Sequence, residues 1–396
     1  MSGKPLSGIR VADFTWVWAG PFCTLQLAHL GAEVIRVETR ERPCVTRLLP
    51  PFADLQPGLN RSGYFNQYNQ GKLSLALDLK HPKGREVLEK LAATADGLLS
   101  NLRGDQPEKL RIRHADLAGA NPKLVCAHLS AYGRDGSRKS WPGYDYLMQG
   151  EAGFLGLSGE PDGPPARMGL SIVDYSTGTT CALALLAGIL EARRTGRGRD
   201  LDVSLYDVAL HLLNYPAAWY LNDGLVTERV ARAAHPFIVP SQLYRTKDGW
   251  IFIMAQTQRF WEVLADALGR GDLKAQYPDF AARRAHRDAL TRILDAEFSK
   301  QTTQAWLEKL RGTVPCAPVY DLAQALENPY FLERGGVQVL DHPDKPGLKL
   351  VASPFRLDEP LPAKPAPKLG EHTEALLAEL GYGEAEITRL KQEKVV

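Results

Sequence analysis

The first forty residues alternate between short apolar runs and a segment with helical spacing. Residues 8–14 (GIRVADF) are typical of a buried strand, residues 21–30 (PFCTLQLAHL) have the spacing of a helix, and residues 31–38 (GAEVIRVE) return as a strand. Pro21 suits the first turn of that helix, where its missing N–H is no loss. This order predicts a βαβ unit, in which a helix connects two parallel strands.

The same alternation continues through the first half of the chain. Further strands are expected at residues 73–79, 97–102 and 123–133, with helices at 82–95 and 175–194, and residues 199–213 are expected to form a strand that leads into a helix. Strands alternating with helices favour an α/β fold, with a Rossmann-like large domain built on a mostly parallel sheet.

The pattern changes after about residue 222. Residues 238–256 alternate around the turn TKDG, which indicates an antiparallel hairpin, and three helices follow at 258–268, 285–298 and 303–311. We therefore expect a large domain over 1–222 and a smaller α+β domain over 223–330.

Composition narrows the function classes. The net charge is +2, and the strongest basic run, EARRTGRGR, is short, so neither nucleic acid nor a membrane surface is an expected partner. The five cysteines show no CxxC spacing and no zinc-type cluster, so we expect a reducing cytoplasm and no metal. The N-terminus lacks a signal-peptide core, and the helix after Asp174 is expected to be too short and interrupted to span a bilayer.

Common nucleotide motifs are missing. Glu38 ends the second strand, where dinucleotide-binding proteins place a ribose-binding acid, but the preceding loop TWVWAGPFCT has two tryptophans and a proline in place of the required glycines. Nicotinamide chemistry is therefore not expected. The chain also lacks a phosphate-binding GxxxxGK[ST] loop, HExxH and a GxSxG elbow.

Two aspartates and one histidine remain as candidates. Asp174, in GLSIVDYSTG, precedes a long apolar helix, so it is either a helix cap or a nucleophilic carboxylate that the helix N-terminus keeps ionised. Ser176 and Thr177 are alternative caps. Asp145 lies in WPGYDYLMQG, and His128 lies near a strand end, where it is either structural or part of a site.

Taken in order, several segments resemble the class III CoA-transferase family, which contains CoA-transferases and 2-methylacyl-CoA racemases. They include VADFTWVWAGPFCTLQLAHLGAEVIRVE (11–38), NQGKLSLALDLKHPKG (69–84), GLLSNLRG (97–104), PGYDYLMQGEAGFLGLSGEPDGPPARMGLSIVD (142–174), TGRGRDLDVSLYDVAL (195–210), HPFIVPSQLYRTKDGW (235–250), VPCAPVYD (314–321) and LGEHTEALLAELG (369–381). The resemblance implies that residues 331–396 complete the large domain. It also implies an interlocked dimer, of two identical chains or of this chain with a paralogue.

The resemblance also implies a reaction. Asp174 matches the family's nucleophile, so the chain is expected to move CoA from an acyl-CoA such as succinyl-CoA to an organic carboxylic acid through an aspartyl anhydride and an aspartyl-CoA thioester. Coenzyme A is then the co-substrate. The positions that match the family's CoA contacts are Trp18, Ala19, Thr39, Arg40, Leu77, Asp78, Leu79, Lys80, Asn101, Leu102, Arg103 and Lys109.

Two departures bear on the substrate. Trp18 stands where oxalate-handling members carry glutamine, which favours a larger or more apolar acceptor than oxalate. Tyr144 stands where the racemases carry the histidine of GHD, so Asp145 is expected to orient the substrate or Asp174, with Tyr144 and His128 on the substrate side. The alternatives are an acyl-CoA racemase or isomerase of the same fold and a catalytically silent CoA-binding subunit.

Overall fold

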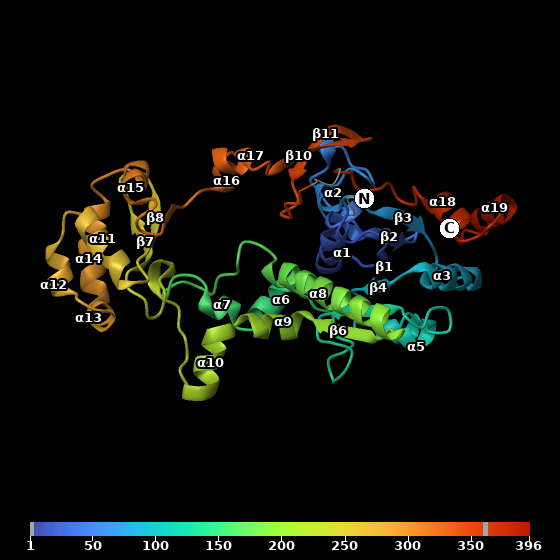
Figure 1. Ribbon diagram of the computed structural model, residues 1–396, viewed down its shortest axis with the longest axis horizontal. Coiled ribbons are helices and arrows are strands. Elements are labelled where there is room, and N and C mark those ends of the chain that lie inside the picture. The colour runs from blue at the N-terminus through green and yellow to red at the C-terminus, as the bar shows by residue number, and fades with distance from the viewer. Residues whose placement is uncertain (1–3, 359–362) are drawn as a thin grey trace. The chain divides into compact units, whose positions relative to one another are not determined.

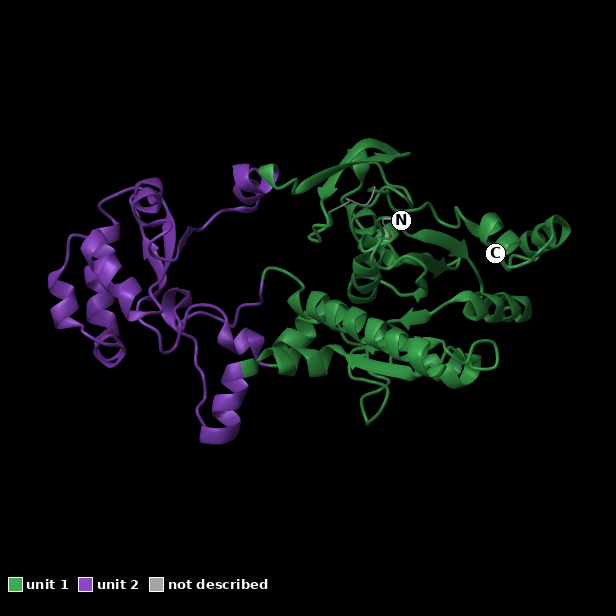
Figure 2. Cartoon of the chain, viewed as in Figure 1, with its two compact units in different colours: residues 1–152, 169–214, 333–396 green, residues 153–168, 215–332 purple. Residues whose placement is uncertain are grey.

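The computed structural model describes residues 4–358 and 363–396 (Figure 1). It divides the chain into two compact units (Figure 2). Unit 1 contains residues 1–152, 169–214 and 333–396, and unit 2 contains residues 153–168 and 215–332.

Unit 2 is larger than the expected small domain of residues 223–330, because it also contains residues 153–168, 215–222 and 331–332. The segment 153–168 belongs to unit 2, although the hydrophobic pattern assigned it to the large domain. The reason is a side chain far along the sequence, because the Arg229 guanidinium donates hydrogen bonds to the carbonyls of Glu160, Gly163 and Pro164 at 2.9–3.1 Å. The hydrophobic periodicity of a segment carries no information about hydrogen bonds to such a distant residue.

Unit 1 is built on a parallel sheet, as the alternation predicted. Its order is β3-β2-β1-β4-β5-β6, with every neighbouring pair parallel. The six strands of this sheet are β1 Arg10–Phe14, β2 Glu33–Glu38, β3 Leu73–Ala76, β4 Gly97–Ser100, β5 Val125–Ser130 and β6 Asp200–Ser204. From β1 the strands β2 and β3 are added on one side of the sheet, and β4, β5 and β6 on the other. In open α/β sheets, ligands bind at the point where the strand order reverses in this way.

The helices of unit 1 come from both ends of the chain. Those of the N-terminal half are α1 Ala19–His29, α2 Gly63–Tyr68, α3 Pro82–Thr94, α4 Gln106–Lys109, α5 His114–Leu117, α6 Asp145–Glu151, α8 Ile172–Thr195 and α9 Leu205–Leu212. The C-terminal helices, α18 Thr373–Glu379 and α19 Glu384–Gln392, lie beside β3 and α3 in Figure 1, and Leu377 and Leu390 share one apolar core with Leu88 of α3. β10 Val337–His342 and β11 Lys345–Val351 form a separate antiparallel pair.

The helix that carries Asp174 differs from its prediction in two ways. α8 begins at Ile172, with Ser171 as its N-cap, so Asp174 is the third residue of the first turn and not the cap. α8 is also a continuous helix of 24 residues, long and apolar enough to cross a membrane by length and hydropathy alone, so the expectation of a short, interrupted helix is wrong. Half of its most apolar window is buried inside the fold, and core helices of soluble proteins pass the same test.

Unit 2 combines a small antiparallel sheet with helices. β7 Ser241–Arg245 and β8 Trp250–Met254 pair around the TKDG turn, as predicted, and β9 Cys316–Pro318 adds to β8. The core behind the sheet includes the buried Trp261 and Trp306. The helices are α7 Phe154–Leu157, α10 Asn214–Asp223, α11 Gln258–Ala267, α12 Asp272–Gln276, α13 Phe280–Ala285, α14 Arg287–Phe298, α15 Thr303–Leu310, α16 Leu322–Leu326 and α17 Pro329–Glu333.

Candidate active site

A cavity of about 850 Å³ lies at the carboxyl ends of the strands of unit 1. Its wall draws on the residues that follow β1, β2, β3 and β4, and on the last residues of the chain. Apolar side chains, among them Phe14, Leu77 and Ile112, share this wall with Arg40 and Lys80. An apolar floor with cations suits a planar base that carries phosphate groups.

Most of the positions that were matched to CoA contacts meet at this cavity. Those in its wall are Thr39, Arg40, Leu77, Asp78, Leu79, Lys80 and Leu102. They come from three separate segments of the chain, and the parallel sheet brings them together because the carboxyl ends of its strands share one edge.

The other five matched positions lie outside the residues that line the cavity. Asn101 holds the lining residue Trp16, because its Oδ1 accepts from the Trp16 N–H and its Nδ2 donates to the Trp16 carbonyl, both at 2.6 Å. Arg103 and Lys109 both pair with Asp105, at 3.4 and 2.5 Å. Trp18 packs against the ring of Tyr64, and its indole Nε1 is buried with no hydrogen-bond partner among the described residues.

Glu38 sits in the cavity wall but is already satisfied. Its carboxylate accepts from Arg47 Nη2 at 2.8 Å and from the Cys44 N–H at 3.0 Å, and Arg36 Nε lies 3.1 Å away. Burial alone would raise the pKa of Glu38, but Arg36 and Arg47 outweigh it and lower that pKa to about 2. Glu38 is therefore a structural anion. Its ion pairs account for an acidic residue at the end of β2, so no nicotinamide ribose is needed to explain it.

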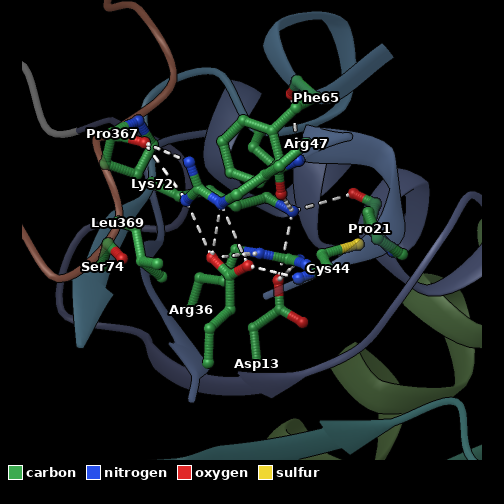
Figure 3. Close-up of polar contacts among 12 residues, drawn as sticks. Asp13, Pro21, Arg36, Cys44, Arg47, Phe65, Lys72, Ser74, Pro367 and Leu369 are labelled. Atoms are coloured by element: carbon green, nitrogen blue, oxygen red, sulfur yellow. Dashed lines mark hydrogen bonds and ion pairs between the residues drawn. The ribbon is translucent and has the colours of Figure 1, made fainter. Parts of the chain in front are cut away.

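The buried ion network continues to the loop that follows β1 (Figure 3). Asp13 accepts from Lys72 Nζ at 3.1 Å, from Thr24 Oγ1 at 2.7 Å and from the Thr15 N–H at 3.0 Å. Burial would raise the pKa of Asp13, but Lys72 and Arg36 hold it below its usual range. The carboxylate thus fixes both the start of the loop and α1, and it positions the residues that line the cavity.

The loop contains a backbone conformation that is uncommon for its residue type. Val17 has φ of 65°, in the left-handed region that β-branched residues rarely adopt. Its N–H donates to Cys44 Sγ at 3.4 Å. Such outliers cluster at functional sites, where the surroundings fix the conformation. Here the turn at Val17 separates Trp16, in the cavity wall, from Trp18 and the first residue of α1.

Asp174 lies at the first turn of α8, next to Asp145. Its N–H donates a 2.9 Å hydrogen bond to Asp145 Oδ2, and Gln149 Nε2 donates to Asp145 Oδ1 at 2.5 Å. Asp145 and Asp174 are 1% and 6% exposed. α6 and α8 therefore bring two carboxylates, distant in sequence, to one buried place.

The environment of Asp174 changes its protonation. Burial, and secondarily the charge of Asp145, raises the pKa of Asp174 to about 7. The expectation that the helix N-terminus keeps this carboxylate ionised is therefore incomplete, because burial disfavours its charged form. At neutral pH the protonated and ionised forms coexist, and the ionised form is poorly solvated, which favours nucleophilic attack.

Close packing joins Asp174 to the loop after β1. Gly178, one turn further along α8, lies against α1 so closely that a methyl group there would lie 2.5 Å from the Ala19 carbonyl oxygen. Phe22 of α1 contacts the ring of Tyr175 at 4.9 Å, and the hydroxyls of Tyr175 and Tyr68 are 2.7 Å apart. The first turns of α1 and α8 thus lie side by side. They lie at the carboxyl ends of the strands, where the cavity also lies.

The remaining candidates have other surroundings. His128 is 1% exposed, with Nδ1 2.9 Å from Ser100 Oγ and Nε2 3.0 Å from Asp200 Oδ1. Burial lowers the pKa of His128, although the bond to Asp200 opposes it. These contacts give His128 a place in the sheet core and favour its structural interpretation. Tyr144 precedes α6, and its side chain is 60% exposed in the single chain.

The family model of CoA-transferase family III matches residues 6–373. The chain belongs to this family and is a CoA-transferase. It is 34% identical to the succinyl-CoA:mesaconate CoA-transferase of Haloarcula hispanica over 388 residues, which cover 96% of this chain and 97% of that protein. It is 33% identical to the succinyl-CoA:glutarate CoA-transferase of Mus musculus, with 98% and 89% covered.

A solved structure agrees with this assignment. A CAIB/BAIF family protein from Brucella suis superposes with a TM-score of 0.82 at 32% identity, and the match covers 96% of this chain and 100% of that one. The α/β fold of the large unit therefore has an experimental counterpart.

Sequence reasoning missed several residues that the structure places at the site. Trp16, Arg42 and the C-terminal residues line the cavity, and Gln149 holds Asp145. Trp16 and Arg42 each lie two residues from a matched position, so their neighbourhood was a usable signal. The C-terminal residues had no such signal, because only the fold brings them to β3.

Proposed function

We propose that this CoA-transferase uses Asp174 as its nucleophile and binds the nucleotide end of CoA in the cavity after β1–β4. The proposal rests on one observation about Asp174. This buried carboxyl has a pKa raised to about 7, and it lies at the carboxyl ends of the strands, where a nucleotide-sized cavity also lies. A carboxylate that served only as a cap would lie at the N-cap and remain solvated.

The reaction then proceeds by exchange between activated acyl groups. The ionised Asp174 attacks the donor thioester carbonyl, forming an aspartyl–acyl anhydride and releasing CoA thiolate. The thiolate attacks the aspartyl carbonyl of the anhydride, which gives aspartyl-CoA thioester and frees the donor acid. The acceptor carboxylate attacks this thioester, forming a second anhydride and again releasing thiolate. The thiolate finally attacks the acceptor acyl carbonyl, and Asp174 is regenerated.

The surrounding groups have defined tasks in this scheme. Asp145 and Gln149 fix the backbone of Asp174, and burial keeps water from the anhydride and thioester. Trp18 offers an indole N–H with no partner among the described residues, at the start of α1, which can donate to a substrate oxygen.

The relatives support a choice of substrates. Two proteins at 33–34% identity are named for succinyl-CoA as donor and for mesaconate or glutarate as acceptor. We therefore assign succinyl-CoA as donor and a dicarboxylic acid of similar size as acceptor. The bulk of Trp18 agrees with an acceptor larger than oxalate. A racemase is less well supported, because the partner of Asp174 is a carboxylate, Asp145, and the adjacent position is the exposed Tyr144.

The assembly is part of the same proposal. We assign an interlocked homodimer, as the resemblance implies, working in the cytoplasm. Size-exclusion chromatography with light scattering of the purified chain tests the dimer, and a monomeric mass would contradict it.

The test of the mechanism is to trap the aspartyl intermediate. The protein is incubated with succinyl-CoA, quenched with hydroxylamine and digested, and the modified residue is mapped by mass spectrometry. We expect a hydroxamate at Asp174 that is absent from Asp174→Asn. Asp207→Asn is the matched control, because Asp207 is the third residue of α9 as Asp174 is of α8, but is exposed. Transfer without any adduct at Asp174 would refute the mechanism.

A further inference from the structure

The last residues of the chain form one wall of the cavity after β1–β4. Lys391, Lys394, Val395 and Val396 all line it. Val395 and Val396 are buried, and the Val395 carbonyl accepts a 2.8 Å hydrogen bond from the N–H of Asp78, another lining residue. Residues 395 and 396 are therefore a fixed part of the site.

Two lysines of this wall differ in their charge partners. Lys391 pairs with Glu374 of α18, so its charge is largely compensated. Lys394 is exposed and makes no ion pair with any described residue. An uncompensated cation on the rim of a cavity attracts a multiply charged anion.

The backbone conformation at Lys394 is one that glycine adopts readily. Lys394 follows the end of α19 with φ of 56°, in the left-handed conformation that usually ends a helix on glycine or asparagine. Glycine adopts this conformation without strain, whereas lysine does not. Replacing Lys394 with glycine therefore removes the ammonium group without straining the backbone.

The order of the sheet shows which part of CoA this lysine faces. The C-terminal wall is bonded to Asp78, which follows β3 at the edge of the sheet. Asp174 belongs to α8, which packs on α1 and β5, towards the other side of β1. The thioester must reach Asp174, so the pantetheine arm and the diphosphate run from the cavity towards β1. The parts of CoA left beside β3 are the adenine and the ribose with its 3′-phosphate, and of these the 3′-phosphate is the anion that an ammonium group binds.

We propose that Lys394 binds the 3′-phosphate of CoA and makes the enzyme select CoA over 3′-dephospho-CoA. The inference rests on the proposed binding of CoA in this cavity. It adds a specificity-determining residue from the segment 391–396, which lines the cavity beside the outer strand β3.

The variant Lys394→Gly tests this without harming the fold, because glycine suits the backbone there. Isothermal titration calorimetry would give Kd for CoA and for 3′-dephospho-CoA. We expect Kd for CoA to rise by roughly tenfold, the size of one charge-assisted hydrogen bond, and Kd for 3′-dephospho-CoA to change by less than about twofold. Lys394→Arg, which keeps the charge, should retain most of the preference.

The matched control is Arg232→Gly. Arg232 is also a cation with positive φ, 62°, but it belongs to unit 2 and is not among the lining residues, so this variant should leave both Kd values unchanged. Equal weakening of both ligands by Lys394→Gly, or no weakening of either, would overturn the inference. Failure of the proposed function looks different, since the unmodified protein would then bind neither ligand.

Discussion

The backbone N–H of Asp174 donates to the carboxylate of Asp145 at 2.9 Å. This bond connects the first turn of α8 to α6 and places one carboxylate where its charge acts on the other. Asp145 thereby positions Asp174 and also contributes to raising its pKa. A single side chain thus affects both the geometry and the reactivity of the nucleophile.

The rate of CoA transfer should depend on the ionisation of Asp174. The pKa of this carboxyl is about 7, and only the ionised form attacks the thioester. We expect kcat/KM for the acyl-CoA to fall as the pH is lowered through 7, by roughly tenfold per pH unit on the acid side. Initial rates at saturating acceptor measure this, and a profile that is level down to pH 5 (about one unit above an unperturbed aspartate) would contradict it.

Asp145→Asn should move that pH profile. An asparagine oxygen can still accept from the Asp174 N–H, but the negative charge is gone, so the pKa of Asp174 should fall by roughly one unit. It should stay above the ordinary value, because burial is the larger cause of the shift. The pH–rate profiles of the two proteins give the comparison. Glu151→Gln, at the exposed end of the same helix, is the control and should leave the midpoint in place.

Asp174→Asn should stabilise the protein at alkaline pH. Because the folded-state pKa of Asp174 is raised to about 7, the folded protein holds this proton more tightly than the unfolded chain does. The native state therefore loses stability as the pH rises from about 4 to 7, by on the order of 2–4 kcal/mol in all. Thermal melts should show Asp174→Asn gaining over the unmodified protein at pH 8 and not at pH 4 (near the pKa of an unfolded aspartate). A constant difference across that range would mean that Asp174 is solvated.

Much of the large unit follows from local pattern. The strands β1, β2 and β3 and the helix between the first two are visible as apolar runs and helical spacing within single segments. The partners of Glu38 are not visible in this way, because Arg47 and Cys44 lie in a loop without periodicity. The start of α8 was placed three residues late because Ser176 and Thr177 resemble caps, whereas the structure uses Ser171.

The candidate site, too, was predicted from the sequence only in part. Asp174 and all twelve CoA positions were predicted through resemblance, and seven of the twelve line the cavity. The raised pKa of Asp174 could not be predicted, because it depends on burial and on a helix that lies 29 residues earlier in the chain. The wall formed by residues 391–396 depends on tertiary packing alone.

Gly178→Ala should separate the first turns of α1 and α8. The added methyl group would lie 2.5 Å from the Ala19 carbonyl, a backbone atom that cannot rotate away. We expect a loss of about 1–3 kcal/mol in the free energy of unfolding, together with a lower kcat. Gly188→Ala, on the same helix, meets the side chains of Val125 and Leu201 instead. Urea denaturation and steady-state rates should show a loss of stability in both variants, but a loss of kcat only in Gly178→Ala.

The bond between Asp78 and Val395 also has a consequence for biosynthesis. A ribosome releases the chain from the N-terminus, so β1 to β6 can pair while the residues that complete the cavity are still in the exit tunnel. Residues 391–396 therefore join the cavity only after the strands that form the rest of its wall have been synthesised. A chain cut before residue 391 would keep Asp174 and most of the sheet but lack one wall of the cavity, so it should bind the nucleotide end of CoA less tightly.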